Sequence, residues 1–284
     1  MKTLLQRSGV YIIQTSGSSR HQGHPDHARV HYRPALFKLL STSIIELAFK
    51  QTSDIRQTMT SSSTPSATTI AIEQRWKLLS DFVETVCAGR SDTHGHAHMK
   101  TVAEMSSFLV QQNYPDRRLL RNLLQDAITA AWLHDVADHK YDHDGTLEQQ
   151  LDEFGTANIP NYTDIKQVIK YVSYSTEHKA ILAGTPLDFQ AILGDYYSRV
   201  RDIVSDADKL ESIGVKGMER SFTYNSETNP TFTHAQVIAE VRKIYDEKLI
   251  KLASQFIKTP TARAFARISN KEMEEWLELA QHEQ

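Results

Sequence analysis

Apolar residues recur every three or four positions through most of the chain after residue 70. This spacing puts them on one face of an α-helix, and the strict alternation typical of half-buried strands is absent. Gly and Pro residues separate the periodic segments, which indicates turns between helices. We therefore predict a single all-α domain without internal repeats over residues 70–284, with helices at 72–87, 98–113, 118–134, 162–174, 188–204, 234–257 and 261–280.

The first 69 residues lack this periodicity. Residues 52–69 contain eleven Ser or Thr in eighteen positions, a composition that cannot build a core and predicts a linker. Residues 1–22 are basic and free of acidic side chains, which is typical of a mitochondrial presequence; an extension without a targeting role is the alternative. We expect residues 1–69 to form a flexible, disordered extension that adds nothing to the domain.

Composition narrows the function classes. The content of 40% hydrophobic and 24% charged residues is that of a soluble globular protein. The single cysteine, Cys87, excludes an intramolecular disulfide, and no apolar run approaches the roughly 20 residues that a membrane span needs. We expect a cytoplasmic protein, or a mitochondrial one if the presequence is real, without a membrane partner.

The charge is unevenly distributed along the chain. Residues 1–69 carry eight Lys or Arg against three Asp or Glu, or +5, so the net charge of −3 leaves −8 on residues 70–284. Duplex nucleic acid binds a basic surface. The acidic domain therefore argues against duplex nucleic acid as its partner.

Histidine and aspartate follow one another in the order H…HD…D. His98 starts a predicted helix with Val102 on the same face, and His134 with Asp135 ends another; Asp208 lies further along the chain. Imidazole and carboxylate together bind divalent ions such as Mn²⁺, Fe²⁺, Co²⁺ or Mg²⁺. Each histidine alone would more often be an ordinary core residue, whereas the full constellation favours a metal site.

Four stretches around these residues carry a family resemblance. The chain resembles the HD-domain metal-dependent phosphohydrolases, from about residue 70 onward, and in particular a branch of small enzymes that includes a bacterial nucleoside triphosphate pyrophosphohydrolase. The resemblance implies an HD-domain helical bundle that holds one divalent ion, Mn²⁺ foremost, with Mg²⁺, Co²⁺, Fe²⁺ or Ni²⁺ as alternatives. The stretches are DTHGHAHMKTV (92–102), AAWLHDVADHKY (130–141), VIKYVSYS (168–175) and VSDADKLESIGVKGMERSFTY (204–224).

The resemblance also assigns the metal ligands. The family places its first histidine four residues before the valine at 102, which selects His98, and its A-D-(K/R)-L motif selects Asp208 as the last ligand, after His134 and Asp135. Asp206 is the alternative last ligand, or a hydrogen-bond partner of a ligated histidine. Residues two apart on a helix point in different directions, so Asp206 and Asp208 are not expected to serve the metal equally.

Other residues are candidates for catalysis and substrate binding. His94 matches an extra histidine of this branch that would orient phosphate or shuttle a proton, whereas His96 has no match and is expected to be solvated.

Asp138 lies one helical step after Asp135 and would act as general base on a metal-bound water; Lys140 would contact a phosphoryl group. Both would otherwise be charges of a polar surface loop. The further substrate contacts expected are Lys209, Lys216, Arg220 and Tyr224, with Phe222 beside the base or in the core and Glu211 facing the same cavity.

The function expected from this resemblance is hydrolysis of a phosphoester or phosphoanhydride bond in a small nucleotide. The branch implies conversion of a nucleoside triphosphate to monophosphate and pyrophosphate, with nucleoside 5′-monophosphatase activity as the alternative. An HD-type di-iron oxygenase needs more histidines, and only His178 lies between residues 144 and 207. A non-catalytic nucleotide-sensing module is the third class. The expected partner is a small phosphorylated substrate, and a homodimer is compatible with the sequence.

Overall fold

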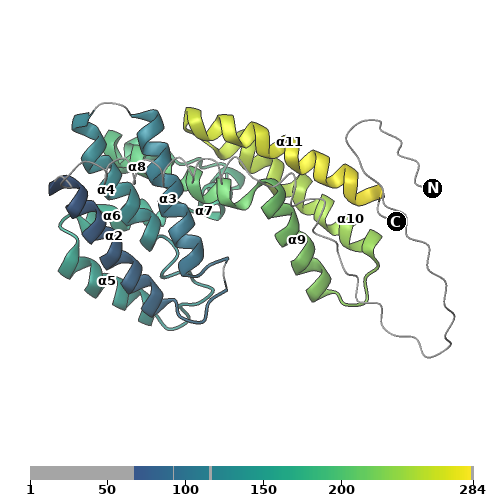
Figure 1. The fold of residues 1–284 in the computed structure, drawn as a ribbon, viewed down its shortest axis with the longest axis horizontal. Helices are drawn as coiled ribbons and strands as arrows, with labels where there is room; N and C mark the ends of the chain where they lie inside the picture. The colour runs from purple at the N-terminus through teal and green to yellow at the C-terminus, as the bar shows by residue number, and fades with distance from the viewer. Residues whose placement is uncertain (1–66, 92, 115–116, 283–284) are drawn as a thin grey trace, which may run out of the picture. The chain divides into compact units, whose positions relative to one another are not determined.

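The protein is helical wherever its computed structural model describes the chain, which is residues 67–91, 93–114 and 117–282 (Figure 1). No strand occurs in these ranges, so the predicted all-α fold is confirmed. The predicted flexible extension and presequence fall almost wholly outside the described residues. The α-helices are α2 (Ala67–Val86), α3 (His96–Asn113), α4 (Arg117–Leu133), α5 (Thr146–Asn158), α6 (Tyr162–Lys170), α7 (Tyr174–Leu182), α8 (Phe189–Ser212), α9 (Gly214–Thr228), α10 (His234–Ile244) and α11 (Pro260–His282), and two π-helical turns, η2 (Tyr245–Leu249) and η3 (Leu252–Phe256), follow α10.

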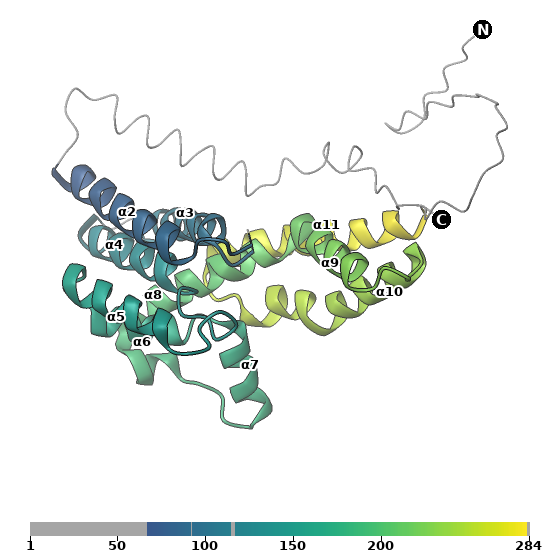
Figure 2. The same ribbon diagram turned by 90° about the horizontal axis from the view of Figure 1, so that it is seen from below.

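The centre of the bundle is the packing of α3 against α4 and α8. Helix α4 also contacts α2 and α6, so its apolar face is covered on several sides (Figures 1 and 2). The facing side chains are fully buried and include Val102 and Leu109 on α3, Ala127 on α4 and Ile203 on α8. Burial of each large apolar side chain stabilises the fold by about 1.5–3 kcal/mol. This packing fixes the ends of three helices relative to one another.

A sharp turn between α8 and α9 reverses the chain. Gly214 has φ of 78°, a left-handed conformation that favours glycine, and a Cβ atom there would lie 3.1 Å from Glu272 and 3.3 Å from Ser269 of α11. Helix α9 then packs against α10 and α11, with Phe222 buried against Trp276. The turn brings the side chains of α9 back toward the end of α8.

A buried ion pair fastens α7 to α8. The guanidinium of Arg201 is fully buried, donates to the carbonyl of Tyr171 at 2.7 Å and to the Glu177 carboxylate at 2.7 Å, and stacks on the Phe189 ring at 3.7 Å. Lys258 completes the charge pairing of Glu177 at 3.1 Å. Because each buried charge has a partner, the loss of one would leave another uncompensated and would destabilise this corner of the fold.

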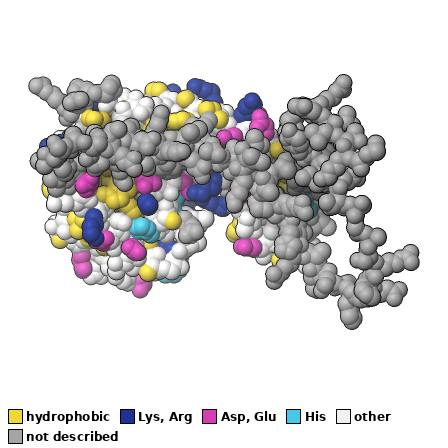
Figure 3. Space-filling view, viewed as in Figure 1, with side chains coloured by type: hydrophobic (Ala, Val, Ile, Leu, Met, Phe, Trp, Pro, Cys, Tyr) yellow, Lys and Arg dark blue, Asp and Glu magenta, His cyan; other side chains and the backbone are white. Residues whose placement is uncertain are grey.

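The surface is of ordinary protein character. Figure 3 shows basic, acidic and hydrophobic side chains interspersed over the described part of one face. None of the described helices combines the length and apolar character that crossing a membrane requires.

Candidate metal centre

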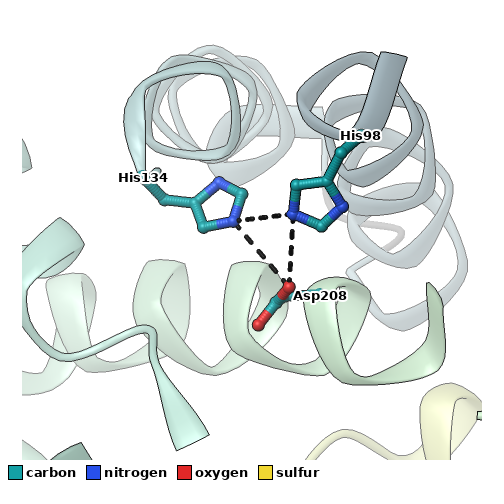
Figure 4. A group of neighbouring side chains, drawn as sticks. All are labelled: His98, His134 and Asp208. Carbon is teal, nitrogen blue, oxygen red and sulfur yellow. Dashed lines mark hydrogen bonds and ion pairs between the residues drawn. The ribbon is translucent and has the colours of Figure 1, made fainter. Parts of the chain in front are cut away.

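Three elements bring their ends together at one place. His98 lies in the first turn of α3, His134 directly follows α4, and Asp208 lies near the C-terminal end of α8 (Figure 4). Asp135 is the next residue after His134. His98 Nε2 is 3.3 Å from His134 Nε2 and 3.5 Å from Asp208 Oδ1, and His134 Nε2 is 3.8 Å from the same oxygen. Asp135 presents one carboxylate oxygen to each imidazole, at 3.8 Å in both cases.

This donor set fits a divalent cation. A metal ion about 2.0–2.2 Å from imidazole nitrogen and carboxylate oxygen holds neighbouring donor atoms roughly 3–3.5 Å apart. The observed separations are close to that range. Two imidazoles whose Nε2 atoms face each other and two carboxylates also need a positive charge between them, which a metal ion supplies.

A hydrogen bond orients the imidazole of His134, and a carboxylate lies near the outer nitrogen of His98. His134 Nδ1 lies 2.7 Å from the carbonyl of Ala131, so Nδ1 carries the proton and the lone pair of Nε2 faces the cluster. His98 Nδ1 faces Glu211 Oε2 at 3.5 Å. A metal-ligating histidine commonly has such a carboxylate or carbonyl on its other nitrogen.

Glu211 is held in place by two cations. Its side chain is only 3% exposed, and it accepts from Lys216 and, at 2.9 and 3.0 Å, from Arg220 Nη2. Burial alone would raise the pKa of Glu211, but His98, Arg220 and Lys216 outweigh burial and lower it to about 2. Glu211 is therefore ionised and lies beside the ring of His98, a more specific position than the sequence indicated.

Arg90 holds the turn that carries the HD pair, and sequence reasoning missed it. Its guanidinium donates to the carbonyls of Asp135 at 2.8 Å and Val136 at 2.6 Å, and lies 4.4 Å from the centre of the Tyr141 ring. These contacts satisfy backbone oxygens beyond the end of α4. No motif marks Arg90, because its role depends on a segment 45 residues away.

A second donor group borders the first. His94 Nδ1 is 3.2 Å from Asp135 Oδ2, and one donor atom each of His94, Asp135 and Asp138 lie within 4.8 Å of one another. Asp138 is 13% exposed, and its Oδ1 accepts from the backbone of Lys140 at 2.9 Å. The ammonium of Lys140 lies 3.8 Å from Asp138 Oδ2 on a side chain that is 55% exposed. The structure thus brings the predicted catalytic residues to the edge of the metal cluster.

Asp208, and not Asp206, lies with the histidines. The buried carboxylate of Asp206 accepts from the backbone nitrogens of Lys258 at 2.8 Å and Thr259 at 2.6 Å, which fastens the segment before α11 to α8. Burial raises the pKa of Asp206 to about 6, although these hydrogen bonds oppose the change. Asp206 is therefore neither placed as a ligand nor in contact with a ligated histidine.

Lys209 lies in the core and not where the predicted contact with substrate phosphate would need it. Its side chain is fully buried, and its ammonium donates to the carbonyl and the hydroxyl of Ser205. Burial, together with the nearby Arg201, lowers the pKa of Lys209 to about 8. Because Lys209 follows Asp208 on α8, its side chain is rotated by about 100° from the cluster, which explains its place in the core.

The remaining candidates are distributed over core and surface. Tyr224 is 63% exposed on α9, one turn after Arg220, whereas Phe222 is buried in the core. His96 is not a solvated side chain, because its Nε2 lies 2.8 Å from the hydroxyl of Ser80 and its ring packs 5.1 Å from Trp132.

Lys248 of η2 is a further cation near the cluster that sequence reasoning missed. Desolvation lowers the pKa of Lys248, the negative charge of Asp208 opposes this change, and the charges of Lys140 and Arg220 add to it. Its ammonium also lies 5.8 Å from the centre of the Tyr174 ring. Lys248 therefore lies within electrostatic range of Asp208, Lys140 and Arg220, which come from three other parts of the fold.

Solved structures, rather than sequences, reveal proteins whose fold is similar to that of this chain. No protein-family model matches it, and no curated protein matches it in sequence. A protein of Lactobacillus plantarum is 22% identical with a TM-score of 0.55, over 74% of this chain and 97% of that one. YpgQ of Bacillus subtilis in complex with ADP is 19% identical with a TM-score of 0.51, over 73% of this chain and 94% of that one. This chain shares their fold.

The donor set predicts how metal is retained. Purified protein should hold about one transition-metal ion per chain, and His134→Ala or Asp135→Ala should empty the site because each removes a ligand. His96→Ala is the matched control and should retain metal, since His96 packs away from the cluster. Elemental analysis provides the measurement, and full occupancy in both ligand variants would contradict the assignment.

The cluster also predicts a pH-dependent stability of the metal-free protein. Burial disfavours protonation of His134, but Asp135 and Asp208 outweigh burial and raise its pKa to about 9. The pKa of a histidine in the unfolded chain is about 6.5, so protonation of His134 stabilises the metal-free fold below that pH. This contribution to the free energy of unfolding is about 3 kcal/mol at most, and it is lost as the pH rises to about 9. Thermal unfolding in EDTA should therefore show a lower Tm at pH 9 than at pH 6. With Mn²⁺ bound in place of the proton the difference should shrink, and an equal shift with and without metal would refute the linkage.

Proposed function

We propose that this protein is a metal-dependent phosphohydrolase that converts a nucleoside triphosphate to the monophosphate and pyrophosphate. The observation that carries the proposal is the convergence of His98, His134, Asp135 and Asp208, from three helix ends, on one point. A divalent ion bound there would polarise a phosphoryl oxygen and lower the pKa of a water molecule. The cations around the point favour an anionic substrate.

Asp138 would take a proton from the attacking water. The backbone of Lys140 donates to its Oδ1, which fixes the carboxylate, and the Lys140 ammonium lies 3.8 Å from its Oδ2. The position next to Asp135 and His94 puts it beside the cluster and away from bulk solvent. A general base needs such hydrogen-bond reach of the water it activates. His94 is the second candidate for this role.

Lys140, Arg220 and Lys248 would bind the phosphate chain. Lys140 is exposed enough to move toward a ligand. Arg220 uses only Nη2 to bond Glu211, so Nε and Nη1 remain for phosphate oxygens. The three charges would also offset the negative charge that develops as the phosphoanhydride bond breaks.

The nucleotide character of the substrate rests on two likenesses. The sequence resembles a branch of nucleoside triphosphate pyrophosphohydrolases, and YpgQ, which shares the fold, was solved with ADP. Cleavage of a nucleoside 5′-monophosphate by the same residues is the alternative, because the metal cluster would act equally on a single phosphate.

A dinuclear centre is a second candidate that one observation favours. His94, Asp135 and Asp138 form a donor group of their own next to the first cluster, and Asp135 could bridge two ions. These three residues supply further ligands of the kind that a di-iron oxygenase needs, although the scarcity of histidines in the sequence did not suggest such an enzyme. In that case Asp138 would be a ligand instead of a base, and elemental analysis would give two ions per chain.

Product analysis tests the proposed activity. Protein loaded with Mn²⁺ and incubated with a panel of nucleoside mono- and triphosphates should release pyrophosphate from a triphosphate. Release of orthophosphate from monophosphates alone would favour the alternative activity. No turnover of any nucleotide by metal-loaded protein would indicate a sensing module, and oxygen uptake with iron bound would indicate an oxygenase.

Asp138→Asn tests the general base. The variant keeps nearly the same volume and should keep one metal ion, yet kcat should fall by about 10²–10⁴, with KM little changed, because the base acts in the transition state. Asp144→Asn, on the exposed part of the same loop, is the control and should leave kcat unchanged. Wild-type kcat in metal-loaded Asp138→Asn would exclude Asp138 and leave His94 as the candidate.

Lys140→Ala should differ by raising KM, since its ammonium contacts phosphate already in the ground state.

A further inference from the structure

A polar cavity lies away from the metal centre. It has a volume of about 310 Å³ and is bounded by α2, α4, the start of α6 and the first part of α8. Asp126 on its wall precedes His134 by eight residues, which corresponds to about 12 Å along a helix. None of the residues that line the cavity belongs to the metal cluster.

Its walls are fixed by hydrogen bonds between three elements. Asn161 Nδ2 donates to Asp126 Oδ1 and to the hydroxyl of Tyr197, both at 3.1 Å, and the hydroxyl of Tyr196 donates to Asp126 Oδ2 at 2.7 Å. Gly194, with φ of 72°, starts a new helical segment just before the two tyrosines and so directs them toward α4. Burial and the bond to Asp126 raise the pKa of Tyr196, so its hydroxyl stays a donor. The cavity is therefore preorganised.

Two opposite charges face this cavity without pairing. Arg75 from α2 and Asp126 from α4 both line it, yet neither makes an ion pair with any residue that the structure describes. The side-chain amides of Asn122 and Gln125 line the same space and bond to no described residue. The Asp126 carboxylate accepts hydrogen bonds from Asn161 and Tyr196 but pairs with no cation in the described part of the chain, and a bound ligand that carries both charges would pair with Arg75 and Asp126 together.

We propose that this cavity is a second small-molecule site, which binds a zwitterion of amino-acid size. The ligand's ammonium would face Asp126 and the tyrosine rings, and its anionic group would pair with Arg75. The amides of Asn122 and Gln125 would bind its polar body. The volume lies at the lower end of the range for small-molecule sites, which suits a free amino acid or a small amine that bears a phosphate ester.

Calorimetric titration of the full-length, metal-loaded protein tests the proposal. The probes are L-glutamine and phosphoethanolamine, which are zwitterions with a carboxylate or a phosphate, and acetate and ethylammonium, which carry a single charge. At least one zwitterion should bind with a Kd of about 1 mM or tighter, and the single charges at least tenfold more weakly. The zwitterion that binds identifies the anionic group.

Variants locate the binding. Arg75→Gln should weaken the zwitterion at least tenfold, whereas Lys77→Gln, which removes an exposed cation from the same helix, should not. His134→Ala should leave binding unchanged, which separates this cavity from the metal centre and from the proposed hydrolase activity. Gln125→Ala gives a second test should Arg75→Gln not fold. Absence of binding of both zwitterions at about 10 mM, wild-type affinity in both cavity variants, or equal binding of acetate would overturn the proposal.

Discussion

The charge interaction among His98, His134, Asp135 and Asp208 is the constraint on which the rest of the structure depends. Two imidazoles and two carboxylates approach within 3.3–3.8 Å where α3, α4 and α8 meet. Without a cation they share protons, as the raised pKa of His134 and the lowered pKa values of Asp135 and Asp208 indicate. Burial of charge on this scale is tolerated because the helices are packed by fully buried apolar residues that hold the donors at this separation.

Residues outside the cluster determine whether it can hold this geometry. Arg90 donates to the carbonyls of Asp135 and Val136. Glu211 faces the imidazole of His98, and the carbonyl of Ala131 faces that of His134. Asp206 acts at a greater distance, since it ties α8 to the chain before α11. A candidate ligand carboxylate and a structural carboxylate thus lie two positions apart on one helix, and the rotation of about 200° between them explains their different surroundings.

The sequence predicted most of the long helices and missed α5, α7 and α9. Helix α7 spans only nine residues, and α5 and α9 are rich in polar residues, so each of the three contains only a few apolar positions. The candidate ligands could be named because each has a flanking motif. Lys209 was misplaced because a motif carries no information on which side of α8 faces the cluster. Arg90 and Lys248 lie on remote segments that only tertiary packing brings close.

The distribution of charge connects the fold to the proposed chemistry. Residues 70–284 carry a net charge of −8, which would repel a nucleotide if it were spread evenly. Lys140, Arg220 and Lys248 come from the turn after α4, from α9 and from η2, and the charges of Asp208, Lys140 and Arg220 all act on Lys248. Local potential depends on the nearest charges more than on the net charge, because solvent screens exposed charges beyond about 8–10 Å. The reversal at Gly214 therefore bears on the proposed function, since it returns α9 to the end of α8, where Arg220 bonds Glu211 beside His98.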